Sequence, residues 1–192
     1  MAKAIIFDCF GVLTSEGWLP FKAKYFGNNP ELYDQATQLI RQANSGLMSQ
    51  EHFIASVAKL AGITPAEAQN SIRKNVPNEP LLKYIQQLKL KYKIGLLSNV
   101  ASNFLDQLFT SDQLNLFDEI SLSYVTKALK PQARAFELIA DRLNVRLNEA
   151  VLIDDQYANV TGARSIGMQA VLYQGDVNQF KQELEKLLEK LN

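Results

Sequence analysis

The feature that most constrains this chain is a short apolar run near the N-terminus, Ile5-Ile6-Phe7, which stops at Asp8 and turns at Gly11. The pattern predicts a strand buried on both faces of a parallel sheet, because such a strand carries no polar side chain until it leaves the core. Asp8 would then lie at the carboxyl end of the strand, where open α/β sheets bind ligands. Aspartate is also common in turns for structural reasons alone, so Asp8 by itself leaves both interpretations open.

The overall composition argues against several classes of function. Acidic and basic residues balance at 20 each, so the chain has no net field to attract nucleic acid or an anionic membrane. No apolar run approaches the roughly 20 residues needed to cross a bilayer, and we expect no signal peptide. Cys9 is the only cysteine, which excludes an intrachain disulfide and favours a cytoplasmic location. The sequence does not indicate an oligomeric state.

From about Ser15 to Pro80 the apolar residues recur at helical spacing, and no segment has the pattern of a strand. Thr64-Pro65-Ala66-Glu67 is a capping box with proline at the first helical position, which predicts a helix start. Gly62 is placed where a preceding helix would end. This part of the chain is therefore predicted to be a small helical unit inserted at residues 15–80.

After Asn78 the pattern alternates between helices and strands. Strands are predicted at 92–97, 117–123, 151–153 and 168–173, with helices between them, including one opened by Lys130-Pro131. Alternation of this kind is typical of a doubly wound parallel α/β sheet. Residues 1–14 and 81–192 would together form this core.

Polar residues follow the predicted strands at the points where they end. These residues are Asp8, Ser98-Asn99, Lys130 and Asp154-Asp155. In a parallel sheet these groups converge at one edge, where the carboxylates would repel one another unless a divalent cation lay between them. Oxygen ligands favour Mg²⁺, while lysine, serine and helix-start amides suit phosphate oxygens. Each residue also has a structural interpretation, such as a helix cap for Asp154-Asp155 or a solvated charge for Lys130.

Together these residues resemble the motifs of the haloacid dehalogenase-like hydrolase superfamily, and the resemblance spans essentially the whole chain. The motifs stand in order as Phe7-Asp8-Cys9-Phe10-Gly11-Val12-Leu13, Leu97-Ser98-Asn99, Leu129-Lys130-Pro131 and Ile153-Asp154-Asp155 with Asn159. The resemblance implies a Rossmann-like core with an inserted helical cap that closes over the site. It also implies an enzyme, a Mg²⁺-dependent phosphatase that acts on a small phosphorylated metabolite.

The resemblance assigns a role to each motif residue. Asp8 would be the nucleophile that forms an aspartyl-phosphate, and Lys130 would stabilise charge on it and on the phosphoryl group. Ser98 and Asn99, with Lys130, would bind the phosphoryl oxygens. The metal ligands would be Asp8, the Phe10 backbone carbonyl and Asp155, with Asp154 binding directly or through water.

One position departs from the family pattern. Phosphatases of this superfamily usually carry a second aspartate, the general acid and base, where this chain has Phe10. Acid–base help is worth roughly 10² to 10⁴ in rate, so its loss matters. Glu16 is a candidate substitute, although a solvent-facing glutamate fits it as well. A branch resembling α-glucose-1-phosphate phosphatases also lacks this aspartate, which points to a sugar phosphate.

Two other functions remain open at this stage. A 2-haloacid dehalogenase would also use Asp8 as nucleophile and would tolerate Phe10, because halide leaves without protonation. Against it, an Asp154-Asp155 pair without metal would repel an anionic haloacid. The third hypothesis is a catalytically weakened binding or regulatory protein, which only Phe10 supports.

Overall fold

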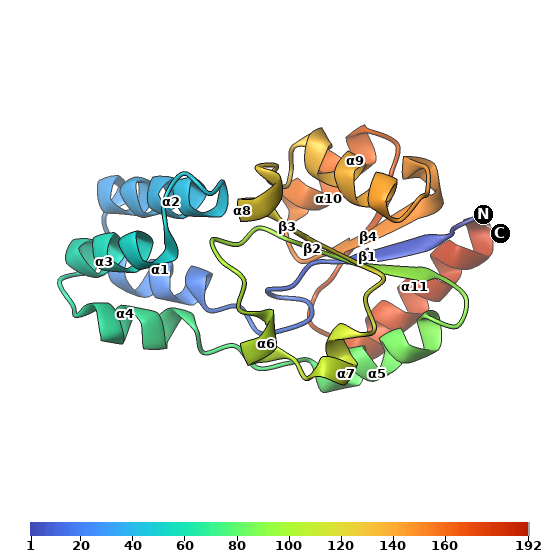
Figure 1. The fold of residues 1–192 in the computed structure, drawn as a ribbon, viewed down its shortest axis with the longest axis horizontal. Coiled ribbons are helices and arrows are strands. Elements are labelled where there is room, and N and C mark those ends of the chain that lie inside the picture. The colour runs from blue at the N-terminus through green and yellow to red at the C-terminus, as the bar shows by residue number, and fades with distance from the viewer. Residues whose placement is uncertain (192) are drawn as a thin grey trace.

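The computed structural model describes residues 1–191. Within them, five strands form one parallel sheet in the order β3-β2-β1-β4-β5 (Figure 1). The strands are β1 (Ala4–Phe7), β2 (Lys93–Ser98), β3 (Glu119–Leu122), β4 (Ala150–Asp154) and β5 (Gln169–Leu172). β1 occupies the centre and pairs in parallel with both β2 and β4, which confirms the predicted Rossmann-like α/β core.

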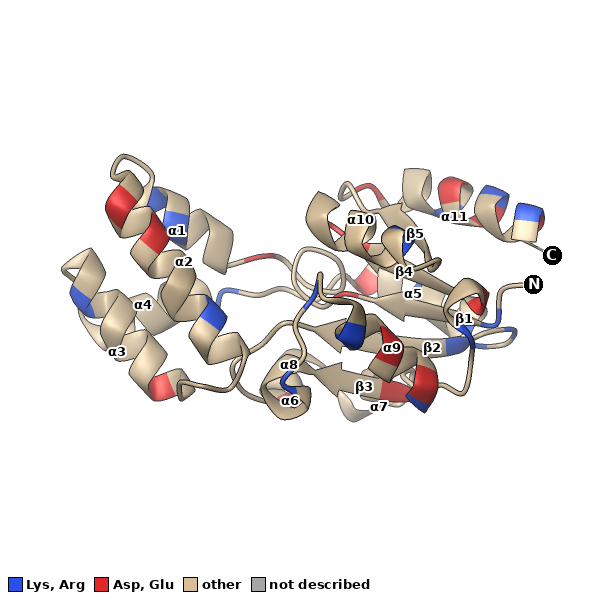
Figure 2. Ribbon diagram, turned by 90° about the horizontal axis from the view of Figure 1, so that it is seen from above, with Lys and Arg blue, Asp and Glu red and all other residues tan. Residues whose placement is uncertain are grey.

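Helices cover both faces of this sheet. β1 shows why both faces are covered, because its side chains alternate between two apolar clusters: Ile5 and Phe7 belong to one, and Ile6 belongs to the other. The helices α5 and α11 lie on the first face, and α9 and α10 lie on the second (Figure 1). These helices are α5 (Glu79–Leu88), α9 (Ala133–Arg142), α10 (Tyr157–Ser165) and α11 (Val177–Leu191). Basic and acidic residues are interspersed over the outer surface of α11 (Figure 2). No helix within residues 1–191 has the length and hydrophobicity required to cross a bilayer.

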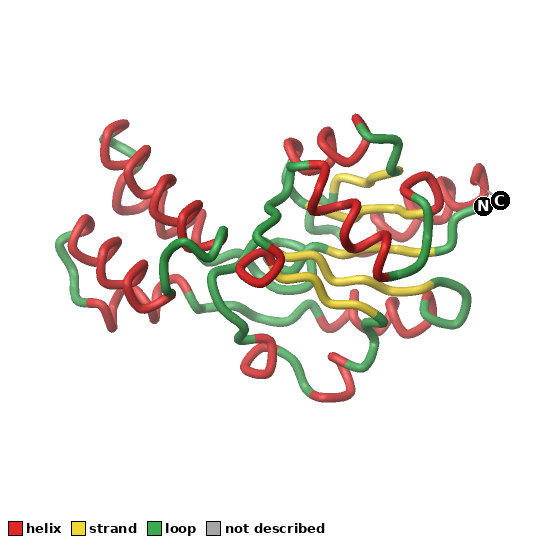
Figure 3. The backbone as a smooth tube through the Cα atoms, turned by 45° about the horizontal axis from the view of Figure 1, so that its top comes forward, coloured by secondary structure: helices red, strands yellow, loops and turns green. Residues whose placement is uncertain are grey.

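The helices that follow β1 form a second body beside the carboxyl edge of the sheet (Figure 3). They pack around an apolar cluster of their own, which includes the buried side chains of Phe21 and Phe53. They are α1 (Trp18–Phe26), α2 (Pro30–Asn44), α3 (Gln50–Ala61) and α4 (Pro65–Ile72). The Thr64 capping box is present, and α3 ends at Gly62 in the left-handed conformation, as the sequence predicts. We call this body the cap; its bounds at residues 15 and 80 stay a prediction.

The two chain segments that join the cap to the core run side by side. The Ser15 amide donates to the Val76 carbonyl over 2.9 Å, and the Asn78 amide donates to the Leu13 carbonyl over 2.8 Å. The Asn78 side chain also donates to the Val12 carbonyl. These bonds hold the start of the cap close to the loop that carries Asp8.

The structure corrects the prediction in the region after β2. The sequence predicts a helix between the strands at 92–97 and 117–123, with Phe104, Leu105 and Leu108 on its apolar face. The chain instead forms two single turns there, α6 (Leu105–Leu108) and α7 (Ser111–Leu114). The reason is a capping box at Thr110, whose hydroxyl accepts from the Gln113 amide and starts a new turn. β3 is likewise shorter than expected and leads directly into α8 (Ser123–Thr126).

The helix expected to open at Lys130-Pro131 instead begins at Ala133. Residues 130–132 stay outside it because Gln132 is extended and because the Lys130 main chain is hydrogen bonded to the Asn99 side chain. A single turn of 3-10 helix, η1 (Leu147–Glu149), precedes β4.

The central position of β1 makes a stability prediction. Ile6 is completely buried, so Ile6→Ala should lower the free energy of unfolding by about 3 kcal/mol through lost burial and a residual cavity. Urea denaturation followed by circular dichroism measures the change. Leu90→Ala is the control, because Leu90 is 84% exposed and its loss should cost less than about 0.5 kcal/mol. Equal effects of the two substitutions would contradict the assigned core.

Candidate active site

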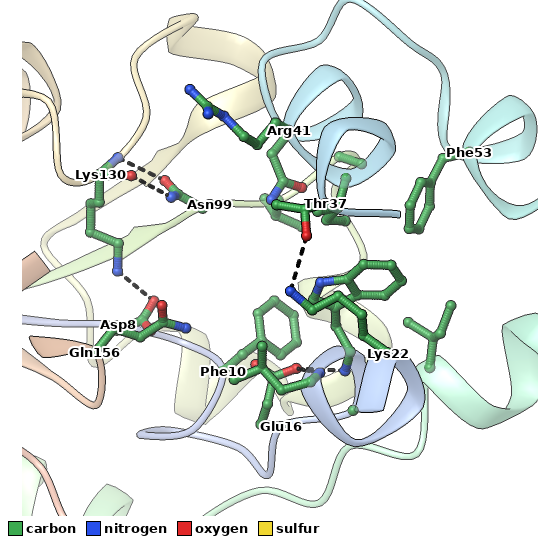
Figure 4. A pocket seen from close by; sticks show the side chains of 18 of the residues that line it. Asp8, Phe10, Glu16, Lys22, Thr37, Arg41, Phe53, Asn99, Lys130 and Gln156 are labelled. Atoms are coloured by element: carbon green, nitrogen blue, oxygen red, sulfur yellow. Dashed lines mark hydrogen bonds and ion pairs between the residues drawn. The ribbon is translucent and has the colours of Figure 1, made fainter. Parts of the chain in front are cut away.

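The sequence-predicted residues meet at the carboxyl edge of the sheet. Asp8 follows β1, Ser98 ends β2, Asp154 ends β4, and Lys130 comes from the loop between α8 and α9. Asp8, Lys130 and Asn99 line one cavity of about 330 Å³ that lies between this edge and the cap (Figure 4). The convergence follows from the parallel order of the strands, which sends each strand end to the same side.

Lys130 bridges Asp8 and Asp154, which lie at the ends of the adjacent strands β1 and β4. Its Nζ lies 2.7 Å from Asp8 Oδ1 and 2.6 Å from Asp154 Oδ2, and the lysine is only 4% exposed. Burial alone would lower the pKa of Lys130, but the charges of Asp8 and Asp154 outweigh it and raise the pKa. The lysine is therefore a fixed positive charge beside Asp8.

Asn99 holds the main chain of Lys130 in place. Its side-chain amide donates to the Lys130 carbonyl over 2.9 Å, and its side-chain oxygen accepts from the Lys130 amide, also over 2.9 Å. This use of Asn99 was not anticipated from the sequence, which assigned the side chain to phosphoryl oxygens. Ser98 lies deeper: it is 1% exposed, and its hydroxyl has no hydrogen-bond partner among residues 1–191.

Asp154 is completely buried, and both of its oxygens are engaged. Oδ2 accepts from Lys130, while Oδ1 accepts from the Gln156 amide and the Asn159 side chain, each over 2.9 Å. Its main effect on the site is to hold Lys130. Asn159, on α10, is itself buried and orients Asp154.

Asp8, Asp154 and Asp155 form an acidic cluster in which each offers an oxygen within 4.8 Å of the others. Burial is the main cause that raises the pKa of Asp8 to about 7. The charge of Lys130 opposes this rise, and the charges of Asp154 and Asp155 add to it. Burial and the charge of Asp154 raise the pKa of Asp155 to about 6. Asp155 Oδ1 is buried and has no hydrogen-bond partner among the described residues.

These features fit a divalent cation. An unpaired buried carboxylate oxygen beside two further carboxylates is the donor set that Mg²⁺ prefers. Burial is the main cause of both raised pKa values, and a cation would offset the carboxylate repulsion that adds to it. Gly11 passes directly against Asp155 with a φ of +85°, so a side chain at this position would collide with that carboxylate. The glycine is therefore required both by the turn and by the close approach.

Two residues near Asp8 bear on proton transfer. Phe10 packs its ring against Phe104, with 5.6 Å between the ring centroids, and offers no acid or base. Glu16 lines the cavity, but its carboxylate accepts hydrogen bonds from the Trp18 and Leu19 amides at the start of α1. Burial raises the pKa of Glu16 in spite of these bonds.

The cavity also contains cap residues that the sequence analysis did not single out, among them Lys22, Thr37, Arg41 and Arg73. The sequence does contain a signal for Lys22, because this lysine lies on the apolar face of α1, next to Phe21 and four residues after Trp18. Nothing in the sequence linked the others to the core motifs.

A comparison with protein families decides the relationship of this chain. The model of the haloacid dehalogenase-like hydrolases matches residues 2–167. The chain belongs to this family. The resemblance predicted from the four motifs is thereby confirmed, and the protein is a hydrolase of the haloacid dehalogenase-like type.

Solved structures share the fold of this hydrolase. A family enzyme from Bacteroides thetaiotaomicron, in complex with magnesium and inorganic phosphate, is 23% identical with a TM-score of 0.72, covering 92% of this chain and 96% of that one. A family hydrolase from Porphyromonas gingivalis is 23% identical with a TM-score of 0.71, covering 96% and 98%. The L-2-haloacid dehalogenase of Xanthobacter autotrophicus, with chloropropionic acid covalently bound, is 19% identical with a TM-score of 0.64, covering 97% and 83%.

A curated relative is the drimenol cyclase drtB of Aspergillus calidoustus, which is 29% identical over 108 residues. The match covers 55% of this chain and only 20% of the cyclase. The matched segment of the hydrolase thus spans about a fifth of the length of that protein.

The acidic cluster makes a prediction on pH and metal. Because the pKa of Asp155 is raised to about 6 from 3.8, the folded protein holds this proton more tightly than the unfolded chain does. The free energy of unfolding therefore falls as Asp155 ionises with rising pH. In EDTA, Asp155→Asn should gain stability relative to the wild type between about pH 5 and about pH 8. Thermal melts at the two pH values measure this.

Mg²⁺ should reverse the ranking of the two proteins at the higher pH, because the wild type gains a ligand that the variant binds less well. Asp34→Asn, at an exposed position on α2, is the matched control and should show neither effect. Melts of Asp155→Asn that follow those of the wild type at both pH values and in Mg²⁺ would contradict the assignment of Asp155 to a cation site.

Proposed function

We propose that this hydrolase is a Mg²⁺-dependent phosphatase that cleaves a small phosphorylated metabolite through an aspartyl-phosphate on Asp8. The observation that carries the proposal is the pairing of one buried lysine with Asp8 and Asp154 beside the incompletely paired carboxylate of Asp155. This arrangement leaves a carboxylate nucleophile next to positive charge, which is what transfer of a phosphoryl group to a carboxylate requires.

The chain's own residues account for two chemical steps. In the first, an oxygen of Asp8 attacks phosphorus and the bond to the ester oxygen of the substrate breaks. In the second, water attacks the same phosphorus, which releases inorganic phosphate and restores the Asp8 carboxylate. Lys130 offsets negative charge on Asp8 and on the phosphoryl oxygens throughout, because Asp154 and Asn99 hold it in position. Ser98 and Asn99 complete the phosphoryl-binding group of the proposal. Ser98 would contribute its hydroxyl, and Asn99 would contribute the side-chain amide hydrogen that the Lys130 carbonyl does not accept.

Asp8, Asp155 and the Phe10 carbonyl would hold the magnesium ion, with Asp154 in support directly or through water. When bound, the ion supplies positive charge that offsets the phosphoryl oxygens and the neighbouring carboxylates. The pKa of Asp8, about 7 from burial and neighbouring negative charge, would fall in the presence of such a charge. Asp8 would then be fully ionised at neutral pH, as a nucleophile must be.

Phe10 restricts the substrate. The ester oxygen that leaves in the first step needs a proton unless it is a comparatively good leaving group, and Phe10 cannot supply one. An anomeric sugar phosphate meets this condition better than a simple alkyl phosphate. Glu16 is the carboxyl group with a raised pKa on the cap side of the cavity, and it stays a candidate for the missing acid. A cytoplasmic location, with a free metabolite as substrate, also stays a prediction.

The structural relatives support two activities. The Bacteroides enzyme was crystallised with magnesium and inorganic phosphate, which agrees with the proposed reaction. The Xanthobacter dehalogenase carries a covalently bound chloropropionic acid, and Phe10 is compatible with that chemistry because halide needs no proton. The acidic cluster favours the phosphatase, because Mg²⁺ would offset the charge of the carboxylates there, whereas the same cluster without metal would repel an anionic 2-haloacid.

Hydrolysis of p-nitrophenyl phosphate tests the proposal, because p-nitrophenolate leaves without a general acid. The wild type should release p-nitrophenol in Mg²⁺ and not in EDTA, and Asp8→Asn should lose at least about 10³-fold in rate. Asp106→Asn, at an exposed position on α6, is the matched control and should keep the wild-type rate.

Chloride release from 2-chloropropionate in EDTA, without p-nitrophenyl phosphate hydrolysis, would instead establish the dehalogenase. The absence of turnover across a panel of phosphorylated metabolites, together with binding of a protein partner, would favour a regulatory role.

A further inference from the structure

The cap wall of the active-site cavity contains a buried lysine that has no acidic partner in the part of the chain that the structure describes. Lys22, on α1, is 7% exposed and lines the cavity. Its Nζ lies 3.2 Å from the Thr37 hydroxyl (Figure 4). The same atom lies 4.0 Å from the centroid of the Tyr33 ring. Within residues 1–191, no ion pair shorter than 4.0 Å includes this ammonium.

A buried ammonium is costly unless a negative charge or a full set of acceptors compensates it. The Thr37 hydroxyl donates its own proton to the Tyr33 carbonyl over 2.8 Å, so it can accept from Lys22 but cannot neutralise it. The Tyr33 ring offers a weak attraction to its face. Lys22 has three N–H donors, and at least one of them is left for a ligand in the cavity.

Two arginines strengthen the positive charge of the same wall. Arg41, on α2, and Arg73, which follows α4, also line the cavity. The Arg73 guanidinium lies over the Phe104 ring at 5.4 Å, and its Nε is buried without a hydrogen-bond partner among the described residues. Glu16 is the acidic residue on this side, but the start of α1 already holds its carboxylate.

We propose that this cap wall binds a second oxyanion of the substrate, so that the enzyme acts on small phosphate monoesters that also carry a carboxylate or a second phosphate. The proposal deepens, and rests on, the phosphatase function proposed above. Lys130 marks the end of the cavity that takes the scissile phosphoryl group, and Lys22 marks the end that takes the second anion. A neutral polyol would leave the charge of Lys22 unpaired, whereas an oxyanion would pair it.

Matched substrates test this inference. The probes are aryl phosphates, because a phenolate leaves without a general acid. They are 4-(ω-carboxyalkyl)phenyl phosphates of increasing chain length, 4-(ω-hydroxyalkyl)phenyl phosphates of the same lengths, and the bisphosphates in which that hydroxyl group is also phosphorylated. In Mg²⁺ the wild type should show a KM about tenfold or more lower for the carboxylates or the bisphosphates than for the hydroxyl series. Comparing the two anionic series tells which oxyanion the wall prefers.

Lys22→Met should abolish this preference, so that the KM ratio between anionic and hydroxyl substrates falls towards one. Lys22→Arg should restore much of it, because the positive charge and donors return. Lys24→Met is the matched control: Lys24 lies on the same helix, also sits over a tyrosine ring (4.8 Å from the Tyr25 centroid), and is exposed. It should keep the wild-type ratio. Ligand-free Lys22→Met should melt no lower than the wild type, which shows that the variant folds.

A wild-type KM for the hydroxyl series equal to or below that for both anionic series would overturn the proposal while leaving the phosphatase intact. Failure of the phosphatase itself shows differently, as no hydrolysis of p-nitrophenyl phosphate in Mg²⁺. In that case calorimetry with 3-phosphonopropionate and propylphosphonate still tests the cap wall. Tighter binding of the carboxylated phosphonate by the wild type, lost in Lys22→Met, supports the anion site, and equal binding overturns it.

Discussion

The active site depends on the ion pairs that Lys130 makes with Asp8 and Asp154. The two carboxylates compensate the charge of the buried lysine, and loss of any one partner would leave a buried charge without its counter-charge. The pairs also tie the loop before α9 to the ends of β1 and β4, so the same contacts that build the site join the elements of the core. Asp155 lies outside these pairs, and its Oδ1, which has no hydrogen-bond partner within residues 1–191, is what makes the cluster suited to a cation.

The sequence predicted much of this core for a physical reason. A strand buried on both faces must be apolar until it ends, so Asp8 and Asp154 mark strand ends in the sequence as they do in space. Parallel order then requires those ends to meet. The roles of Asn99 and Asp154 are harder to infer from sequence. Asn99 binds the main chain of Lys130 and Asp154 binds its side chain, and only the folded loops bring these distant residues together.

The cap shows the limit of prediction from sequence. Its helices follow from capping boxes and apolar spacing, which are local properties. What it presents to the core depends on how α1 and α2 lie over the sheet edge, and no local pattern contains that information. Lys22 is instructive, because a lysine on an apolar helix face conflicts with packing, and such conflicts tend to occur where function requires them. The two short turns α6 and α7, in contrast, depend on a local signal, the capping box at Thr110 that starts a new turn.

The most direct test of the central claim is the position of a bound metal. Crystals of the protein grown with Mn²⁺, an anomalous scatterer that replaces Mg²⁺, should show an anomalous peak within coordination distance of Asp8 and Asp155, with Lys130 still paired to Asp8 and Asp154. A peak elsewhere, or no peak together with Lys130 withdrawn from Asp8, would contradict the account.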